Sequence, residues 1–354
     1  MAYTDIDDPS AYFQTTLYTG NGGTQSITNT GNSDLQPDWI WIKARNEAEH
    51  HNLIDSVRGN TKVVYSSLSG AEDTTSIQVT GFASDGFALG SGTNTNKNNI
   101  TYAAWQWKAG TSFTNDASST SIGSIDSAGS FNNDAGFSIF TFTGTGSIGT
   151  IKHGLNTKPD VIFIKGRSEA KAWTVYHSSL GAGKALFLEQ TSAAVDHPRY
   201  WNDVEPTTSV FTAGSSTNLT GNGITFVGYA FSEKKGYSKF SSYIGNGSDT
   251  PNGVFVYLGF TPAYILIKAT DSNSWVIVDN KRPADSNPVD SSLAADSTAT
   301  ETTGDSNTTF DFLSNGFRTN GNSGNNNSSG QEYVFLAFAF NPFVTSTGVP
   351  ATAR

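Results

Sequence analysis

Residues 158–167, KPDVIFIKGR, contain the stretch that decides the fold. Four apolar residues at 161–164 follow a Pro-Asp pair and precede Lys-Gly-Arg. A short, continuous run of β-branched and aromatic residues is typical of a strand that is buried on both faces. Similar stretches occur at 36–45, QPDWIWIKAR, and at 261–270, TPAYILIKAT. The sequence therefore predicts the same buried strand in three places.

Four further motifs recur around these strands in a constant order, which predicts an internal repeat. One Gly-containing motif precedes each buried strand. An apolar stretch, a second Gly-containing motif and an aromatic-rich stretch follow it. The closing stretch alternates large residues as a half-buried strand does. In copy order, the motifs are LYTGNG (17–22), TFTGTG (141–146) and SYIGNG (242–247); HNLID (51–55), WTVYH (173–177) and WVIVD (275–279); SDGFALGSG (84–92), TSVFTAGSS (208–216) and SNGFRTNG (314–321); and ITYAAWQW (100–107), ITFVGYAF (224–231) and VFLAFAF (334–340).

The repeat predicts an all-β chain of three tandem homologous β-sandwich units, which are jelly-roll-like. We expect unit 1 at 13–110, unit 2 at 137–236 and unit 3 at 237–343. Three segments lie outside the units. They are an N-terminal attachment segment at 1–12, a Ser/Asp/Gly-rich linker at 111–136 and a C-terminal tail at 344–354.

Composition excludes several classes of function. The chain has 354 residues and a formal net charge of −10, whereas a general nucleic-acid binder needs a basic surface. It has no cysteine, so disulfides and thiolate metal sites are excluded. No stretch has 18 consecutive apolar residues, so we expect no membrane insertion by a helix. The N-terminus also lacks the apolar core of a signal peptide.

The polar tracts between the last two strands of each unit contain the candidate surface-binding residues. We expect these Asn- and Gly-rich tracts to form exposed hairpin loops. Trp201 lies in the loop-like sequence HPRYWNDVEP (197–206), where an exposed ring can stack on a sugar. The candidates are Trp201, Asn94, Asn96, Asn218, Asn322 and Asn325.

Two strand-end positions also recur and have two interpretations. In the structural interpretation, each lysine ends its apolar run, reaches solvent and pairs with the acidic residue on the next strand. In the functional interpretation, the positions form a ligand site three times per chain. His177 takes the place of an aspartate in the second copy, and we expect it to cap a strand end at the surface. The positions are Lys43, Lys165 and Lys268, with Asp55, His177 and Asp279.

Motifs for catalysis and cofactors are missing. The sequence GTGSIG (144–149) matches a dinucleotide-binding pattern, but no helical period follows it, so we interpret it as a turn. The five histidines are not spaced as zinc ligands. We therefore expect no catalytic residue, no cofactor and no metal, with one structural Ca²⁺ bound by aspartates as the open alternative.

Taken together, the motifs resemble a family of repeated β-domains, of poorly known function, in virion proteins of marine tailed bacteriophages. This resemblance implies a structural component of a phage particle, usually a tail fibre or another appendage, and it implies no catalytic residue. It covers nearly the whole chain and rests on these stretches: IDDPSAYFQT, LYTGNG, QPDWIWIKAR, DSVRG (55–59), SDGFALGS, YAAWQWKAG, GFSIFTFTGTG, IKHGL (151–155), GYSKFSSYIGNG, GVFVYLGF, DFLSNGF and NPFVTSTGVPATAR.

Three functions follow as hypotheses. The first is a non-enzymatic tail fibre or appendage protein that contributes to host-surface recognition through a glycan or protein. The second is a capsid-decorating or tail-attachment structural protein without host contact. The third is a glycan-degrading enzyme, which needs a pair of carboxylates that the repeats do not supply. We expect a virion location after assembly in the bacterial host cytoplasm, other virion proteins as partners, and a homo-oligomer, with a trimer as one candidate form.

Overall fold

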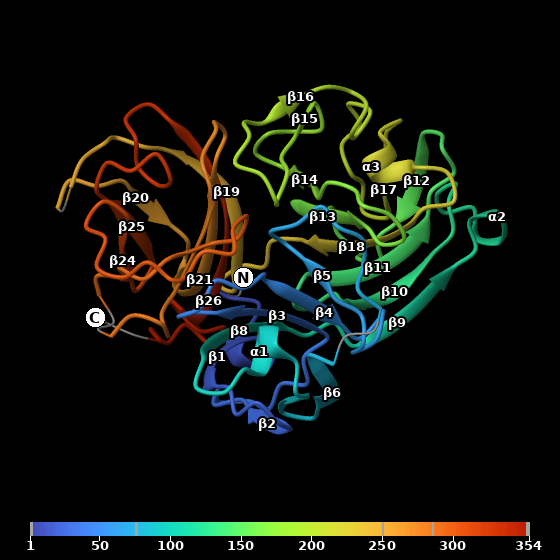
Figure 1. Cartoon of the computed structure of the whole chain (residues 1–354). Coiled ribbons are helices and arrows are strands. Elements are labelled where there is room, and N and C mark those ends of the chain that lie inside the picture. Colours follow the sequence, from blue (N-terminus) through green and yellow to red (C-terminus); the bar gives the residue numbers. More distant parts are fainter. Residues whose placement is uncertain (1–2, 75–76, 250, 285–286, 352–354) are drawn as a thin grey trace.

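Strands make up most of the regular structure of the chain (Figure 1). The computed structural model describes residues 3–74, 77–249, 251–284 and 287–351. Within these ranges the helices are short: the 3-10 helix η1 (Pro9–Ala11) and the α-helices α1 (Thr93–Asn96), α2 (Ala117–Thr120) and α3 (Thr217–Thr220). None of the helices in the described ranges is long and apolar enough to span a membrane. The predicted all-β class is confirmed.

The first part of the chain forms a large and a small antiparallel sheet. The large sheet, called main sheet 1, has the strand order β1-β8-β3-β4-β5, and the small sheet has the order β2-β7-β6. The strands are β1 (Phe13–Thr19), β2 (Gln25–Thr28), β3 (Trp39–Ala44), β4 (Asn52–Asp55), β5 (Val64–Tyr65), β6 (Val79–Ala83), β7 (Gly86–Leu89) and β8 (Thr101–Trp107).

The middle of the chain forms main sheet 2, with the order β14-β13-β18-β11-β10-β9, and the small pairs β12-β17 and β15-β16. Its strands are β9 (Thr111–Asn115), β10 (Ser127–Asn132), β11 (Phe137–Thr143), β12 (Gly149–Lys152), β13 (Val161–Gly166), β14 (Thr174–His177), β15 (Lys184–Ala185), β16 (Val195–Asp196), β17 (Val210–Ala213) and β18 (Thr225–Phe231).

The last part forms main sheet 3, with the order β19-β26-β21-β22-β23, and the small sheet β20-β25-β24. Its strands are β19 (Ser238–Ile244), β20 (Phe255–Tyr257), β21 (Phe260–Ala269), β22 (Trp275–Asp279), β23 (Leu293–Ala294), β24 (Thr309–Leu313), β25 (Gly316–Asn320) and β26 (Glu332–Pro342). The first four strands of main sheets 1 and 3 have the same order as β11, β18, β13 and β14 in main sheet 2.

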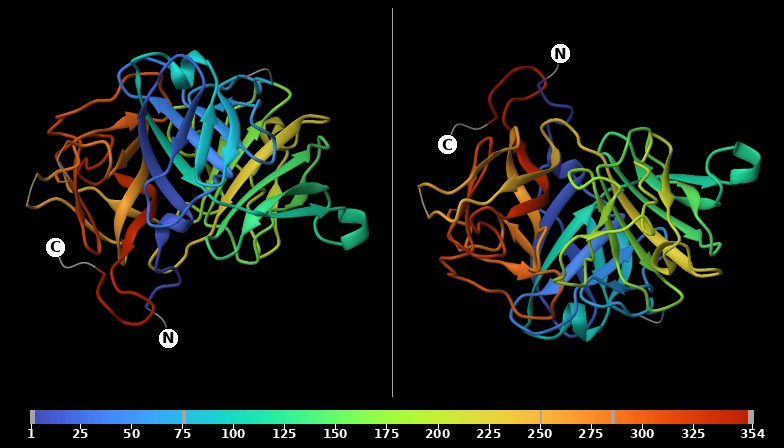
Figure 2. Two further views of the ribbon diagram at one scale, coloured as in Figure 1. Left: turned by 90° about the horizontal axis from the view of Figure 1, so that it is seen from below. Right: turned by 90° about the horizontal axis from the view of Figure 1, so that it is seen from above.

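The three main sheets pack their inner faces against one another around a shared core (Figure 2). Aromatic rings join each pair of sheets. Trp39 stacks on Tyr229 at a centroid distance of 4.4 Å. Trp107 meets Tyr264 edge-on at 5.7 Å, and Phe231 meets Phe338 at 5.7 Å. The sheets are therefore held together by their largest side chains.

The outer face of each main sheet is also buried, which explains the continuous apolar runs. In β3, Trp39 and Trp41 belong to the shared core, whereas Ile40 and Ile42 belong to a separate core beneath the first small sheet. Because successive side chains of a strand point to opposite faces, a sheet that is covered on both faces needs apolar residues at every position. The prediction of three doubly buried strands is confirmed for β3, β13 and β21.

Two of the segments predicted to lie outside the units differ from expectation. Residues 111–136 are not a linker, because they form β9, α2 and β10, and β10 pairs with β11 along six residues. Residues 3–12, part of the predicted N-terminal attachment segment, pack onto the fold: Thr4 and Ile6 are buried, and Asp7 accepts a hydrogen bond from the backbone of Ser346 at 2.7 Å. Residues 1–2 of the predicted attachment segment and 352–354 of the predicted tail lie outside the described residues. Figure 2 shows both termini at the same end of the molecule.

Candidate functional site

The repeated lysines lie at the ends of β3, β13 and β21, and the structure buries them. Lys43, Lys165 and Lys268 are each 0% exposed. The ammonium of Lys165 donates to the carbonyls of Lys171 at 2.7 Å and Ser69 at 2.9 Å, so it joins main sheets 2 and 1. Burial lowers the pKa of each of the three lysines to about 8. The prediction that they reach solvent and pair with the recurring acidic residues is wrong, because backbone carbonyls are their partners.

The recurring aspartates bind arginines instead. Asp55 accepts from Nε of Arg58 at 2.5 Å, and Asp279 accepts from Nε of Arg282 at 2.6 Å. All four side chains in these two pairs are 0% exposed. An ion pair this deeply buried must be hydrogen-bonded at its other polar atoms as well. Some of those further bonds come from the same part of the chain, and others come from a neighbouring main sheet.

At the junction of main sheets 1 and 2, the Asp55–Arg58 pair belongs to a network of five residues, which also includes Glu72, Arg167 and Tyr229. Glu72 accepts from Arg58 and from Arg167 of main sheet 2, each at 2.9 Å. The hydroxyl of Tyr229 on β18 donates to Asp55 at 2.7 Å. Burial alone would raise the pKa of the Glu72 carboxyl, but the two arginines lower it below its ordinary value. Glu72 therefore stays ionised between two cations.

The junction of main sheets 3 and 1 repeats this arrangement. Glu301 accepts from Arg45 at 2.8 Å and from Arg282 at 3.0 Å. Here the indole nitrogen of Trp105 on β8 donates to Asp279 at 2.9 Å. Two of the three junctions are thus closed by buried charges.

At the third junction, between main sheets 2 and 3, neutral residues occupy the positions equivalent to these charged ones. His177 is 1% exposed, so the prediction that it caps a strand at the surface is wrong. Its Nε2 lies 3.2 Å from the carbonyl oxygen of Phe335. Burial lowers the pKa of His177 to about 4, so the ring is neutral near pH 7. Ala194 follows His177 by the same spacing as Glu72 follows Asp55, and its backbone nitrogen donates to the carbonyl of Thr270 at 2.9 Å.

The Asn-rich tracts connect a small sheet to a main sheet and are not hairpin loops. Asn96 is 0% exposed, and its amide donates to the carbonyls of Gly23 at 2.6 Å and Gly90 at 2.8 Å. Asn325 accepts from the backbone of Ser274 at 3.3 Å. Among the other candidates, Asn94 and Asn218 are half-buried in α1 and α3, and Asn322 is exposed. The side chain of Asn96 therefore holds two chain segments together and is not available to a ligand.

Trp201 is buried, which overturns its assignment as an exposed sugar platform. It is 1% exposed and packs edge-on against Tyr176 and Phe211 at centroid distances of 5.8 and 6.3 Å. These rings belong to the outer core of main sheet 2. The sequence did not indicate this burial, because a loop that packs onto a core has no regular spacing of apolar residues.

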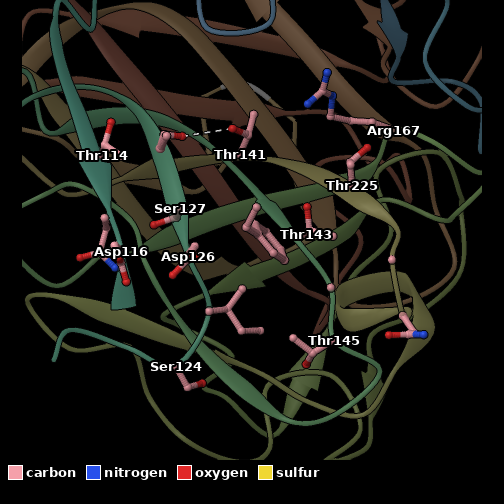
Figure 3. Close-up of a pocket in the computed structure, with 17 residues that line it drawn as sticks. Thr114, Asp116, Ser124, Asp126, Ser127, Thr141, Thr143, Thr145, Arg167 and Thr225 are labelled. Carbon is pink, nitrogen blue, oxygen red and sulfur yellow. Dashed lines mark hydrogen bonds between the residues drawn. The ribbon is translucent and has the colours of Figure 1, made fainter. Parts of the chain in front are cut away.

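A groove of about 840 Å³ lies on main sheet 2, away from all of these predicted residues. It is bounded by β9 and β10, which main sheets 1 and 3 lack, and by the ends of β11 and β18 (Figure 3). Figure 1 shows this hairpin at the edge of the molecule, with α2 at its tip. The groove is therefore built on the part of the chain that departs from the common strand order.

A row of threonines crosses one face of the groove. Thr225 pairs with Thr143, Thr141 pairs with Ala128, and Ala128 pairs with Thr114. Paired residues and residues two apart on a strand share a face, so all five side chains lie on one face of four adjacent strands. The same face of β11 carries Phe137 and Ile139 in the shared core. This face of main sheet 2 is therefore apolar where the other main sheets pack on it. It carries hydroxyl groups where it extends beyond those sheets.

Several of these hydroxyls are available to a ligand. Thr141 donates to the carbonyl of Ala128 at 3.2 Å, shown by the dashed line in Figure 3. Thr114 and Thr143 are exposed and Thr225 is half-buried. Their hydroxyls have no hydrogen-bond partner within the described parts of the chain. Each can donate one hydrogen bond and accept two.

The charged groups at the groove are fixed by the protein. Asp116 caps α2 by accepting from the backbone of Ser118 at 3.0 Å, and Asp126 accepts from the backbone of Ala117 at 2.8 Å. Hydrogen bonds from Ser118 and Ser119 lower the pKa of the Asp116 carboxyl. Arg167 is held by Glu72 across the junction. In the described residues, no group of three or more His, Asp or Glu side chains is placed to hold a metal ion.

A domain of unknown function, DUF7483, matches residues 8–342, which include all three main sheets. The chain belongs to the DUF7483 family. No curated protein and no solved structure matches it.

Sequence reasoning missed the groove of this DUF7483 chain because it assigned residues 111–136 to a linker. Two signals were present. The stretch TSFTN at 111–115 places polar residues on both sides of Phe113, and TFT at 141–143 places threonines on both sides of Phe142. An apolar residue between polar neighbours indicates a strand with one face exposed to solvent. The alignment of the threonines into one row depends on strand register, which neither stretch reveals alone.

Proposed function

We propose that the DUF7483 chain is a non-enzymatic structural protein of a phage particle, such as a tail fibre or appendage, and that its threonine-lined groove binds a host-surface glycan. The threonine row across β18, β11 and β9 carries this proposal, because the hydroxyls of Thr114, Thr143 and Thr225 have no partner within the described residues. A rigid, flat array of hydroxyl and amide groups matches the hydroxyls of a sugar chain, since both sides can donate and accept hydrogen bonds.

The carboxylates at the groove support binding over hydrolysis. A glycosidase needs one carboxyl with a raised pKa that can donate a proton. The pKa of Asp116 is lowered by its hydrogen bonds, so it suits the role of an acceptor. Asp126 is committed to the backbone of Ala117. Both side chains hold the turn that forms the rim of the groove.

The arrangement of the sheets supports a rigid particle component. We interpret the three main sheets with their small sheets as three tandem homologous β-sandwich units, because the first four strands of each main sheet share one order. These units already meet around one core within a single chain. The threefold arrangement that fibres obtain by trimer formation can thus be supplied by one chain, and a homo-oligomer would multiply it.

Glycan binding can be tested with matched threonine pairs. Thr143→Val together with Thr225→Val removes two groove hydroxyls without changing side-chain shape. Thr19→Val together with Thr101→Val is the control, since these residues pair at the same position of main sheet 1. Each lost hydrogen bond is worth about 0.5–1.5 kcal/mol, so affinity for host envelope polysaccharide should fall roughly five- to 100-fold in the groove variant alone.

Equal affinity of both variants for the polysaccharide would contradict the groove assignment. Failure of the unmodified chain to bind any envelope polysaccharide, with its location on the capsid shell by electron microscopy of particles, would favour the alternative. In that alternative the chain is a decorating or tail-attachment protein without host contact. The exposed Tyr3 and Val349 beside the two termini favour attachment at that end in either case.

A further inference from the structure

The outer edge of β1 is open, whereas the corresponding edge in main sheet 2 is covered. In main sheet 2, β11 pairs with β18 on one side and with β10 on the other. In main sheet 1, β1 occupies the position of β11 and pairs with β8 alone. No backbone-to-backbone hydrogen bond within the described residues joins β1 to any other strand. The described chain therefore shows an edge of this kind with an added strand on β11 and edges without one on β1 and β19.

A groove runs beside β1. One cavity of about 340 Å³ contacts Phe13, Gln14 and Thr15, and an adjoining cavity of about 350 Å³ contacts residues 15–18. Consecutive residues of a strand point to opposite faces, so a space that touches all of them lies along the edge of the strand. An unpaired edge of this kind offers a row of backbone donors and acceptors.

One buried polar atom at the groove has no partner. Thr15 lines both cavities and is 7% exposed, yet its Oγ1 makes no hydrogen bond in the described structure. A buried hydroxyl without a partner costs free energy. A ligand in the groove that bonds to Thr15 Oγ1 would remove that cost.

The groove is suited to a negatively charged ligand. Among the described residues, no Asp or Glu lines the two cavities, although the whole chain carries a net charge of −10. Lys281 lines both cavities, its side chain is exposed, and it forms no ion pair in the described structure. Phe340, which is 47% exposed, adds an apolar surface at one end.

We propose that the edge of β1 binds an extended, acidic segment of a partner protein as an added antiparallel strand. Residues from the 26–32 segment line the groove beside β1, together with Asn280 and Lys281. Because segments from main sheets 1 and 3 both line the groove, a single added strand fits it better than the edge of a second copy's whole sheet. The β10 strand on β11 is the precedent within the chain, and strand addition to a free edge is a general mode of peptide binding.

The precedent also fixes a register. Ser130 of β10 pairs with Ile139, and Ile139 occupies the position of Thr15 when Phe137 is aligned with Phe13. A bound strand should therefore place one residue opposite Thr15 and close to Lys281. An acidic side chain at that position would face the lysine.

The test uses a capped nine-residue peptide with the sequence of residues 126–134, DSAGSFNND, and variants of it with Asp or Lys in place of Ser130. Fluorescence anisotropy with the full chain should show the highest affinity for the Asp peptide, a lower affinity for the Ser peptide and the lowest for the Lys peptide. Each substitution should change the affinity by about two- to fivefold, the range expected for a partly exposed ion pair. Lys281→Glu in the protein should reverse the order. Lys184→Glu, at an exposed lysine on β15, is the control and should leave the order unchanged.

Backbone pairing is tested with two N-methylated peptides. One carries methyl groups at positions 127, 129 and 131, and the other at 128, 130 and 132. Because alternate residues of a strand bond to one neighbour, one peptide should lose binding by at least about tenfold and the other should keep it. Equal binding of both, no binding of any peptide at about 1 mM, or an affinity order insensitive to Lys281→Glu would each overturn the proposal. The groove of β1 is separate from the threonine-lined groove, so its test is independent of glycan binding.

Discussion

Loss of the Glu72 carboxylate should show how much the buried charges at a junction contribute to the stability of the fold, compared with the neutral junction. Glu72 is the shared acceptor of Arg58 and Arg167, at 2.9 Å from each, and its side chain is only 4% exposed. Glu72→Ala leaves Arg58 fully buried with Asp55 as its remaining ionic partner. Removing one partner from a buried ionic network costs about 3–5 kcal/mol. We expect the free energy of unfolding to fall by that amount.

The chain itself contains a replacement for the whole network. At the third junction, the equivalent positions hold residues that close the contact without charge. Replacing a buried ionic group by fitting neutral residues is often neutral or stabilising. The five-residue replacement should therefore recover at least about 2 kcal/mol of what Glu72→Ala loses. The substitutions are Asp55→His, Arg58→Leu, Glu72→Ala, Arg167→Thr and Tyr229→Leu, copied from His177, Leu180, Ala194, Thr270 and Leu336.

Equilibrium unfolding in urea measures both effects, with tryptophan fluorescence and far-ultraviolet circular dichroism as two probes of one transition. A loss below about 1 kcal/mol for Glu72→Ala would place the network with ordinary surface ion pairs and refute the reasoning. A five-residue variant as unstable as Glu72→Ala would show that the neutral junction depends on its own surroundings and is not a second solution to the same packing problem.

Two further predictions concern stability. Burial lowers the pKa of His153 and His177 to about 4, below the ordinary 6.5, so each stabilises the fold above pH 6.5 and loses that contribution as the pH falls toward 4. His177→Gln should reduce the loss of unfolding free energy between pH 7 and pH 4 by up to about 3 kcal/mol, and an unchanged difference would contradict this. Gly20→Ala should lower the unfolding midpoint in urea, because a Cβ there would lie 2.3 Å from the carbonyl oxygen of Lys97. Gly81→Ala, where the Cβ meets open space, is the control; equal shifts for both would show that the contact is unimportant.

The buried strands could be predicted from sequence because their signal is local. In β13, four apolar residues in succession already require cover on both faces, and no distant residue changes that conclusion. The recurring lysines could not be placed in this way. Lys165 lies at the end of an apolar run, as a residue that reaches solvent would. One of the carbonyls that bind its ammonium belongs to Ser69, which the fold brings to it from 96 positions away in the chain.

The candidate sites were predicted in the wrong places because the recurring positions belong to the frame of the fold. Repetition in the sequence drew attention to positions that recur, and recurring positions such as Asp55 are those that hold the common frame together. The two grooves lie where the copies differ. One is built by the β9–β10 hairpin, and the other is left open along β1, where that hairpin has no counterpart.

Arg167 connects the frame to the first groove. It lines the threonine-lined groove and is held at 2.9 Å by Glu72 of the neighbouring main sheet. Its charge is therefore already balanced, and its position is set by the packing of two sheets. A ligand that fills the groove meets an arginine that is held in place before binding, which reduces the entropy lost on binding. In the proposed recognition role, the junction of main sheets 1 and 2 would contribute to binding as well as to stability, since it fixes the position of Arg167 at the groove.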